Sequence, residues 1–185
     1  MAFTLTTPRL LLRPWQESDR QPFRDLNADP RVMEFFPAPL TPQASDELFD
    51  RVHQHFARHG YGPFAAELVE THTFIGFIGL SIPAFDAPFM PAVEIGWRLA
   101  VDTWGQGLAT EGARAVLDYG FNELELPAIV SFTTATNLRS RHVMEKLGMT
   151  YNPADDFDHP AIPEGHPQRP HVLYRLTRAQ RQSTP

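Results

Sequence analysis

The chain has 185 residues, 42% hydrophobic and 21% charged, with no cysteine, which fits one domain over 1–185 with a sizeable core. The lack of cysteine excludes disulfide scaffolds, thiolate metal sites and a thiol nucleophile, while a net charge of −6 without a Lys/Arg block argues against nucleic-acid binding. Neither a transmembrane run of ~20 apolar residues nor a signal-peptide pattern is found, so we expect a cytoplasmic protein without a membrane partner.

The first half of the chain predicts one strand, two helices and a β-hairpin. Proline stops the first apolar run, and Ser-Asp and Thr-Pro pairs are typical helix starts. The expected elements are a strand at 9–13, a helix from Ser18-Asp19 to about Asn27, a helix from Thr41-Pro42 to Gly60, and strands at 61–69 and 73–82 joined by a short turn.

The second half alternates strands and helices. In the strand at 93–101, period two puts Glu94, Gly96, Arg98 and Ala100 on the face opposite the apolar residues. A glycine turn and four further elements follow: a helix to about Phe121, a strand from Ile129 to Thr134, a helix from Asn137 to Leu147 ended by Gly148, and final strands at Tyr151 and 171–176. This order predicts an α+β or mixed α/β sheet domain.

Prolines divide the chain into three zones. Seven of the 18 lie between Pro8 and Pro42 and five between Pro153 and Pro170, whereas residues 92–152 contain one. Because proline disfavours strand and helix interiors, the most regular structure is expected in 92–152. We therefore expect a Pro/His-rich loop at 153–171, with the last strand and tail at 172–185.

The turn Gly105-Gln106-Gly107 lies where a strand leads into a helix. Free N–H groups and the positive end of the helix dipole can bind phosphate oxygens there. No Gly-Lys-Ser/Thr follows, so a P-loop is not indicated. A dinucleotide fingerprint would need a glycine where Thr110 stands, which makes a dinucleotide-dependent oxidoreductase a weak alternative. A simple tight turn is the other interpretation.

Two ordered motifs carry a family resemblance. They are Glu94-Ile95-Gly96-Trp97-Arg98-Leu99 with Trp104-Gly105-Gln106-Gly107-Leu108-Ala109-Thr110-Glu111, and Asn137-Leu138-Arg139-Ser140 with Glu145-Lys146-Leu147-Gly148-Met149. Together they resemble the GNAT acyl-CoA N-acyltransferases, and most closely their RimJ/RimL-like branch of ribosomal-protein N-terminal acetyltransferases. The opening segment 9–14 and Asp19 also resemble that branch, so the match spans most of residues 7–151.

The resemblance implies a fold and a donor. The fold is a mixed, bent central sheet of about six to seven strands with flanking helices, whose fourth and fifth strands splay apart to admit pantetheine. The donor is acetyl-CoA, bound by a cassette at 92–152, without a metal. One departure is Trp104, which stands where the wider superfamily prefers Gln or Arg.

The family's binding residues can be carried over one by one. The backbone of Leu99, Ala100 and Val101 would bind pantetheine, and the N–H groups of Gln106, Gly107, Leu108, Ala109 and Thr110 would hold the pyrophosphate. Asn137 would contact the cofactor, and Ser140 would lie near its sulfur.

Amide formation from a thioester needs a base for the protonated amine and a proton for the departing thiolate. Glu94 is the candidate base, and its alternative is a solvated carboxylate paired with Arg98 on the same face. Ser140 is the candidate proton donor, and its alternative is a first-turn residue of a helix that Asn137 caps. Tyr151 is a second candidate acid.

Other polar and aromatic residues have simpler interpretations. His53, His55 and His59 lie on one predicted helix, but without a further defined ligand they indicate a solvated face rather than a metal site. Glu111 and Arg114 are expected to pair on a helix surface. In the resembled branch the segment 30–40 borders the acceptor site, where Phe35 or Phe36 would line it.

The sequence therefore predicts an acetyl-CoA-dependent N-acetyltransferase that transfers acetyl directly to a primary amine. The acceptor is a protein or peptide N-terminus or an amine-bearing small molecule. A non-catalytic acyl-CoA-binding regulatory module on the same fold is the main alternative. The oligomeric state stays open, although homodimers are common among relatives.

Overall fold

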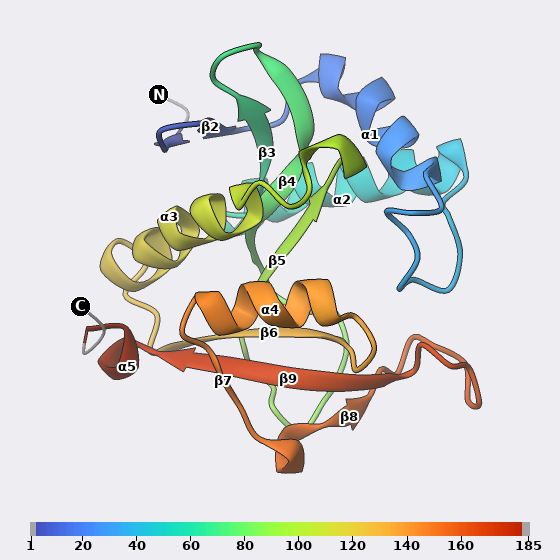
Figure 1. The fold of residues 1–185 in the computed structure, drawn as a ribbon, viewed down its shortest axis with the longest axis vertical. Coiled ribbons are helices and arrows are strands. Elements are labelled where there is room, and N and C mark those ends of the chain that lie inside the picture. The colour runs from blue at the N-terminus through green and yellow to red at the C-terminus, as the bar shows by residue number, and fades with distance from the viewer. Residues whose placement is uncertain (1–2, 183–185) are drawn as a thin grey trace.

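The computed structural model describes residues 3–182 and contains one mixed sheet flanked by helices (Figure 1). The sheet has nine strands among these residues: β1 (Leu5–Thr6), β2 (Leu10–Arg13), β3 (Pro63–Leu68), β4 (Thr73–Ser81), β5 (Glu94–Leu99), β6 (Ala128–Thr134), β7 (Thr150–Tyr151), β8 (Phe157–Asp158) and β9 (Pro170–Thr177). Its order is β1-β2-β3-β4-β5-β6-β9-β7, with β8 also paired to β9. The predicted fold class is confirmed.

Five α-helices and three short 3₁₀ turns connect the strands of the described chain. They are α1 (Arg20–Ala28), α2 (Pro42–His59), α3 (Leu108–Asn122), α4 (Leu138–Lys146) and α5 (Arg178–Gln182), with 3₁₀ turns at Glu17–Asp19, Val101–Thr103 and Pro153–Asp155. No helix within residues 3–182 has the length and apolarity needed to cross a bilayer.

β5 and β6 pair at one position and then diverge. Every other strand pair is antiparallel, whereas these two are parallel and share one register pair, Glu94 with Val130. The Val130 N–H donates to the Val93 carbonyl at 2.9 Å, and the two strands then diverge, as Figure 1 shows. The splay expected between the fourth and fifth predicted strands lies here.

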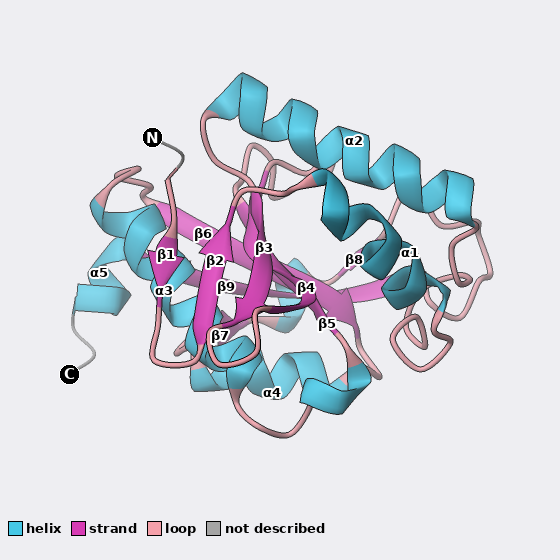
Figure 2. Ribbon diagram, turned by 90° about the horizontal axis from the view of Figure 1, so that it is seen from above, coloured by secondary structure: helices cyan, strands magenta, loops and turns pink. Residues whose placement is uncertain are grey.

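Two apolar cores cover the two faces of the sheet. One joins α3 and α4 to the strands through buried residues such as Ile95, Leu117 and Met144. The other joins α1 and α2 to the opposite face through Trp15 and Phe49. Figure 2 shows α1 and α2 on one side of the strands and α4 on the other. The splay therefore opens between two independently packed helical layers.

Local signals fix both ends of α2 and the start of α4. The Thr41 hydroxyl accepts the Ala44 N–H at the start of α2, which ends at Gly60 with φ +74°. The Asn137 side chain accepts the Ser140 N–H at the start of α4. Both ends match the predicted start and stop signals.

The structure differs from the sequence-based expectations at several points. The strand count is nine rather than six to seven, because the two-residue strands β1, β7 and β8 are too short to give a periodic pattern. The predicted strand 93–101 ends at Leu99, and Val101 begins a 3₁₀ turn. The last strand begins at Pro170 rather than 172, and the expected loop before it contains β8.

Candidate active site

A cavity of about 1460 Å³ opens beside the splay. Its walls come from β5, β6, α2, α3 and α4 and from the segments around Phe36 and His159. Seven of the predicted site residues besides Glu94 line it: Leu99, Gly107, Leu108, Ala109, Thr110, Asn137 and Ser140. Ala100, Val101 and Gln106 are not among the lining residues.

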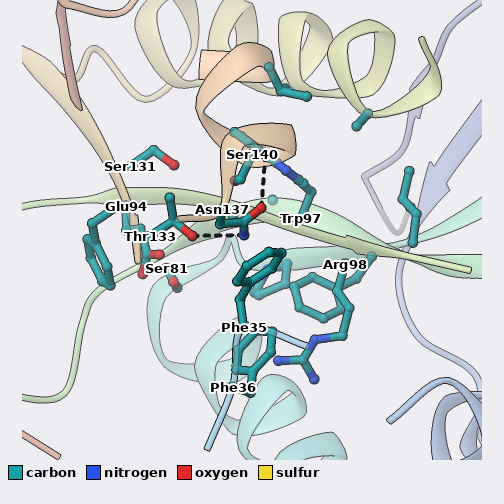
Figure 3. A pocket seen from close by; sticks show the side chains of 18 of the residues that line it. Phe35, Phe36, Ser81, Glu94, Trp97, Arg98, Ser131, Thr133, Asn137 and Ser140 are labelled. Atoms are coloured by element: carbon teal, nitrogen blue, oxygen red, sulfur yellow. Dashed lines mark hydrogen bonds between the residues drawn. The ribbon is translucent and has the colours of Figure 1, made fainter. Parts of the chain in front are cut away.

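Glu94 lies at the point where β5 and β6 part. It faces Ser81 across the β4–β5 pair, and its side chain lines the cavity near Thr133 (Figure 3). Burial raises the pKa of Glu94 to about 8, and a hydrogen bond with Ser81 acts in the opposite direction. The carboxyl is therefore a base whose ionised form grows as the pH rises through this value.

The alternative interpretation, in which Glu94 pairs with Arg98, is not what the structure shows. Four residues along an extended strand span about 13 Å, and the guanidinium turns to α1, where it donates to the Oδ1 of Asn27. Glu94 is left with Ser81 as its hydrogen-bond partner.

The glycine turn presents free backbone donors to the cavity. Gly105 and Gly107 have φ of +71° and +79°, a left-handed conformation that favours glycine. Gly107 starts α3 without any side-chain cap, and the first helical bond runs from the Glu111 N–H to the Gly107 carbonyl. The N–H groups of Leu108, Ala109 and Thr110 thus precede that bond, as the predicted anion site requires.

Arg9, the residue before β2, stabilises this turn through its guanidinium. Its Nη1 donates to the Gln106 carbonyl at 2.9 Å, and its Nη2 lies 2.6 Å from a Glu111 oxygen. The predicted Glu111–Arg114 pair is therefore wrong. Burial acts to raise the pKa of Glu111, but hydrogen bonds from Thr7 and Arg9 outweigh it and lower the pKa. Arg114 instead donates to the Lys146 carbonyl.

The end of β5 directs backbone groups into the gap that β6 leaves. The Ala100 N–H donates to the Ile75 carbonyl of β4 at 2.8 Å. Because N–H groups alternate between the two sides of a strand, those of Trp97 and Leu99 face the splay. The Trp97 backbone is a site feature that the motif comparison did not single out.

Trp104 holds the segment that follows β5 in place through two hydrogen bonds. Its indole N–H donates to the Leu99 carbonyl at 2.8 Å, and its own backbone N–H donates to the Val101 carbonyl at 3.0 Å. The Ala100 carbonyl accepts both the N–H and the hydroxyl of Thr103. The carbonyls of Leu99, Ala100 and Val101 therefore have partners within the protein, which leaves the Leu99 N–H facing the gap.

Asn137 and Ser140 meet at the start of α4. Asn137 accepts the Ser140 N–H at 3.2 Å and donates to the Thr133 hydroxyl at 2.9 Å, so its amide holds α4 against β6 (Figure 3). The capping interpretation of Asn137 is thus correct, and the residue also lines the cavity. The Ser140 hydroxyl is independent of the cap, because the cap uses the backbone N–H.

Tyr151 is not brought to the cavity. It is 37% exposed, stacks on Tyr174 with ring centroids 5.3 Å apart, and donates its hydroxyl to Asp156 at 2.9 Å. That hydrogen bond raises its pKa. Of the two candidate proton donors, Ser140 lines the cavity and Tyr151 does not.

Phe35 and Phe36 both line the cavity, as expected for this segment. Arg98 lies with its guanidinium carbon 4.3 Å from the Phe36 ring centroid and 5.5 Å from that of Phe77. Arg139 of α4 reaches the same segment, where it pairs with Glu34 and lies over Phe35. The segment thus closes one side of the cavity.

Two histidines of α2 contact each other through their rings. His55 and His59 have ring centroids 4.5 Å apart, and burial lowers the pKa of His55. Within the described chain, no three His, Asp or Glu residues converge in a way that could hold a metal ion.

Sequence reasoning missed Ser81, Thr133 and the Arg98–Asn27 contact. Strand pairing places Ser81 opposite Glu94, and a register prediction for the hairpin and the next strand could have found it. Asn27 is 71 residues from Arg98 in the chain, and no local signal joins them.

The comparisons with known proteins agree with this geometry. A family model described as the acetyltransferase (GNAT) domain matches residues 9–150. The FsC-acetyl coenzyme A-N(2)-transacetylase of Aspergillus fumigatus is 32% identical over 190 residues, covering 95% of this chain and 76% of that protein.

Solved structures share the fold over nearly the whole chain. An acetyltransferase from Agrobacterium tumefaciens C58 has a TM-score of 0.75 at 32% identity, with 94% of each chain covered. RimJ from Mycobacterium smegmatis, solved with CoA-disulfide, has a TM-score of 0.72 at 22% identity, with 95% of this chain and 86% of RimJ covered. The match of the family model over 142 residues and the likeness to these relatives lead to one conclusion: the chain belongs to the GNAT family of acetyltransferases.

Proposed function

We propose that the protein is an acetyl-CoA-dependent N-acetyltransferase that transfers the acetyl group directly to a primary amine, with residues 1–185 acting as one domain. The observation that carries the proposal is the splay of β5 and β6 immediately beyond Glu94. A base, a gap lined by free backbone N–H groups and an uncapped helix start lie along one continuous cavity.

The residues around the splay fit acetyl-CoA. The N–H groups at the start of α3 suit its pyrophosphate, and the inward-facing backbone of Trp97 and Leu99 suits the amide groups of pantetheine. When bound, acetyl-CoA supplies an activated acetyl group as a thioester. Backbone donors fixed at the splay are suited to stabilise negative charge on an acyl oxygen without reorganisation.

Glu94 is the proposed base, acting directly or through water. An amine acceptor is mostly protonated at neutral pH, and a carboxylate of raised pKa is a stronger proton acceptor than an ordinary one. Ser81 beside it provides a hydroxyl that can hold the carboxyl in place or pass on a proton. Ser140, at the start of α4, is the proposed proton donor to the departing thiolate.

Two finer assignments belong to this proposal. The RimJ/RimL-like branch is supported by the motifs and by the fold of Mycobacterium smegmatis RimJ, and it would favour a peptide α-amine. The Aspergillus relative is named as an acetyl coenzyme A N(2)-transacetylase, which specifies transfer to a nitrogen atom. We favour a small-molecule acceptor, because Phe35 and Phe36 line the cavity and aromatic side chains are typical of small-ligand pockets.

The test combines binding and turnover. Acetyl-CoA should raise the melting temperature through linkage, and an amine library should show acceptor-dependent release of free CoA thiol. Glu94→Gln should abolish most of the turnover and keep the thermal shift. Glu123→Gln, a substitution at an exposed position outside the cavity, is the matched control.

Three results would overturn the proposal. Stabilisation by acetyl-CoA without thiol release for any amine would favour a regulatory acyl-CoA-binding module. Stabilisation by NAD(P) but not by CoA would favour an oxidoreductase. Equal activity of Glu94→Gln and the wild type would remove the carboxylate from the reaction.

A further inference from the structure

The cavity carries an unusual charge balance for a site that binds an amine. Of the described residues that line it, Glu94 is the one carboxylate, whereas five are Arg or Lys: Arg51, Arg58, Arg98, Arg139 and Lys146. CoA phosphates can account for cations near α3 and α4. They do not account for Arg98, which lies on the sheet face that carries α1 and α2.

The Arg98 side chain is half-buried and has no carboxylate partner in residues 3–182. One N–H of Nη1 donates to the neutral Oδ1 of Asn27, and Nε is buried without any hydrogen-bond partner there. The rings of Phe36 and Phe77 flank the guanidinium carbon at 4.3 and 5.5 Å. Most of the N–H donors of this cation therefore have no acceptor within the protein.

The contacts of Arg98 fix its position without neutralising its charge. Asn27 is fully buried and donates to the Ser45 hydroxyl at 2.9 Å, so the amide that orients Arg98 is itself held by α2. Burial lowers the pKa of Arg98 to about 10, which still leaves it charged at neutral pH. A partly buried cation without a counter-charge costs stability, and an anionic ligand would offset that cost.

We propose that Arg98 binds an anionic oxygen group of the acceptor, so that the substrate is a small amine that also carries a carboxylate or a phosphate. This inference rests on the proposed function, because it assigns the acceptor class of the same site. A guanidinium held between aromatic rings presents its edge to a planar or tetrahedral oxyanion, which it can bind through two N–H groups.

The distance between the two ends of the site constrains the acceptor. Glu94 and Arg98 lie on the same face of β5, about 13 Å apart along the strand. Figure 3 shows Glu94 beside Ser81 and, apart from them, Arg98 beside Phe36. The acceptor is therefore elongated, with its amine near Glu94 and its anionic group several bonds away.

The inference can be tested with matched acceptors. Primary amines of increasing chain length would be assayed in four forms, ending in a methyl group, a carboxamide, a carboxylate or a phosphonate. At the best length we expect an anionic form to exceed the carboxamide in kcat/KM by about 10- to 100-fold. The carboxylate and phosphonate arms show which oxyanion the site takes.

Arg98→Gln should remove this preference by raising the acceptor KM, with the KM for acetyl-CoA unchanged. Arg98→Lys, which keeps the charge but loses the fork of N–H groups, should retain part of it. Arg181→Gln on α5, an arginine paired with Asp118 outside the cavity, should keep the full preference. The acetyl-CoA thermal shift verifies that each variant is folded.

The inference is overturned if the carboxamide or methyl forms are the best acceptors at every length, or if Arg98→Gln keeps the anionic preference. In either case acetyl transfer itself would still stand. Failure of acetyl-CoA to bind, or of every amine to react, would instead overturn the proposed function and this inference with it.

Discussion

The two sides of the cavity present different kinds of groups to a ligand. The α3/α4 side presents backbone N–H groups of a glycine turn and of a strand end, within a nearly proline-free stretch. The α1/α2 side presents the side chains of Glu94, Arg98 and Phe36, which distant segments hold in place. Backbone recognition depends on a local conformation, whereas side-chain recognition depends on tertiary contacts.

This difference makes the two sides separable by mutation. Substitutions on the backbone side should change the KM for acetyl-CoA, and substitutions on the side-chain side should change the turnover or the acceptor. The following expectations test that separation.

The largest effect is expected for Glu94→Gln. Loss of a positioned base should lower kcat/KM by about 10²- to 10⁴-fold. Steady-state kinetics with a saturating acceptor would measure it, and the KM for acetyl-CoA should stay within the error of the wild type. A rise in that KM comparable to the loss of turnover would contradict the separation.

Ser140→Ala should have the next largest effect. A hydrogen bond to a charged sulfur is lost, which predicts a fall in kcat of about 10- to 100-fold. The α4 cap should persist, because it uses the Ser140 N–H, so the melting temperature should change little. Ser18→Ala, at an exposed site, is the control. A loss of stability without a loss of kcat would make Ser140 a structural residue.

Gly107→Ala should raise the KM for acetyl-CoA about tenfold. A Cβ in the left-handed conformation costs about 1–2 kcal/mol, which opposes the turn geometry that aims the N–H groups at the ligand. Gly60→Ala at the end of α2 carries the same strain, with φ +74° and open space around the added Cβ. It should lower the melting temperature similarly and leave this KM unchanged, whereas equal KM effects would refute anion binding at the turn.

Arg9→Gln should give the smallest effect, at most about a fivefold rise in the KM for acetyl-CoA. The exposed Arg9–Glu111 pair contributes up to about 1 kcal/mol to stability. The same guanidinium also donates to the Gln106 carbonyl of the glycine turn. The matched control is Arg31→Gln, which breaks an exposed ion pair with Asp29 just after α1, on the α1/α2 side. A larger effect for Arg31 would reverse the comparison.

The same distinction explains what the sequence could reveal. Gly107, Asn137 and the helix ends at Thr41 and Gly60 were predictable, because their roles depend on neighbouring residues alone. Glu94 was predicted as the base, but its partner Ser81 depends on the register of two strands.

The errors have a common origin in local reasoning. Glu111 was assigned to Arg114 by helical spacing, yet Arg9 reaches it from β2, about 100 residues earlier. A pair of Arg98 with Glu94 was considered as an alternative because they share a face, yet the guanidinium donates to Asn27 in α1. Sequence spacing shows which residues of one helix or strand can contact each other. Contacts between residues of different elements depend on how the layers pack.

The most direct test of the account measures kcat/KM for the wild type and for Glu94→Gln as a function of pH and takes the ratio of the two. Titration of the acceptor amine is common to both enzymes, so the ratio of their kcat/KM values isolates the carboxyl group. Because burial raises the pKa of Glu94 to about 8, its basic form increases with pH up to that value. We predict a ratio that rises about tenfold per pH unit below pH 8 and levels off above it. A ratio that stays constant from about pH 6 to 9 would contradict the assignment of Glu94 as the base.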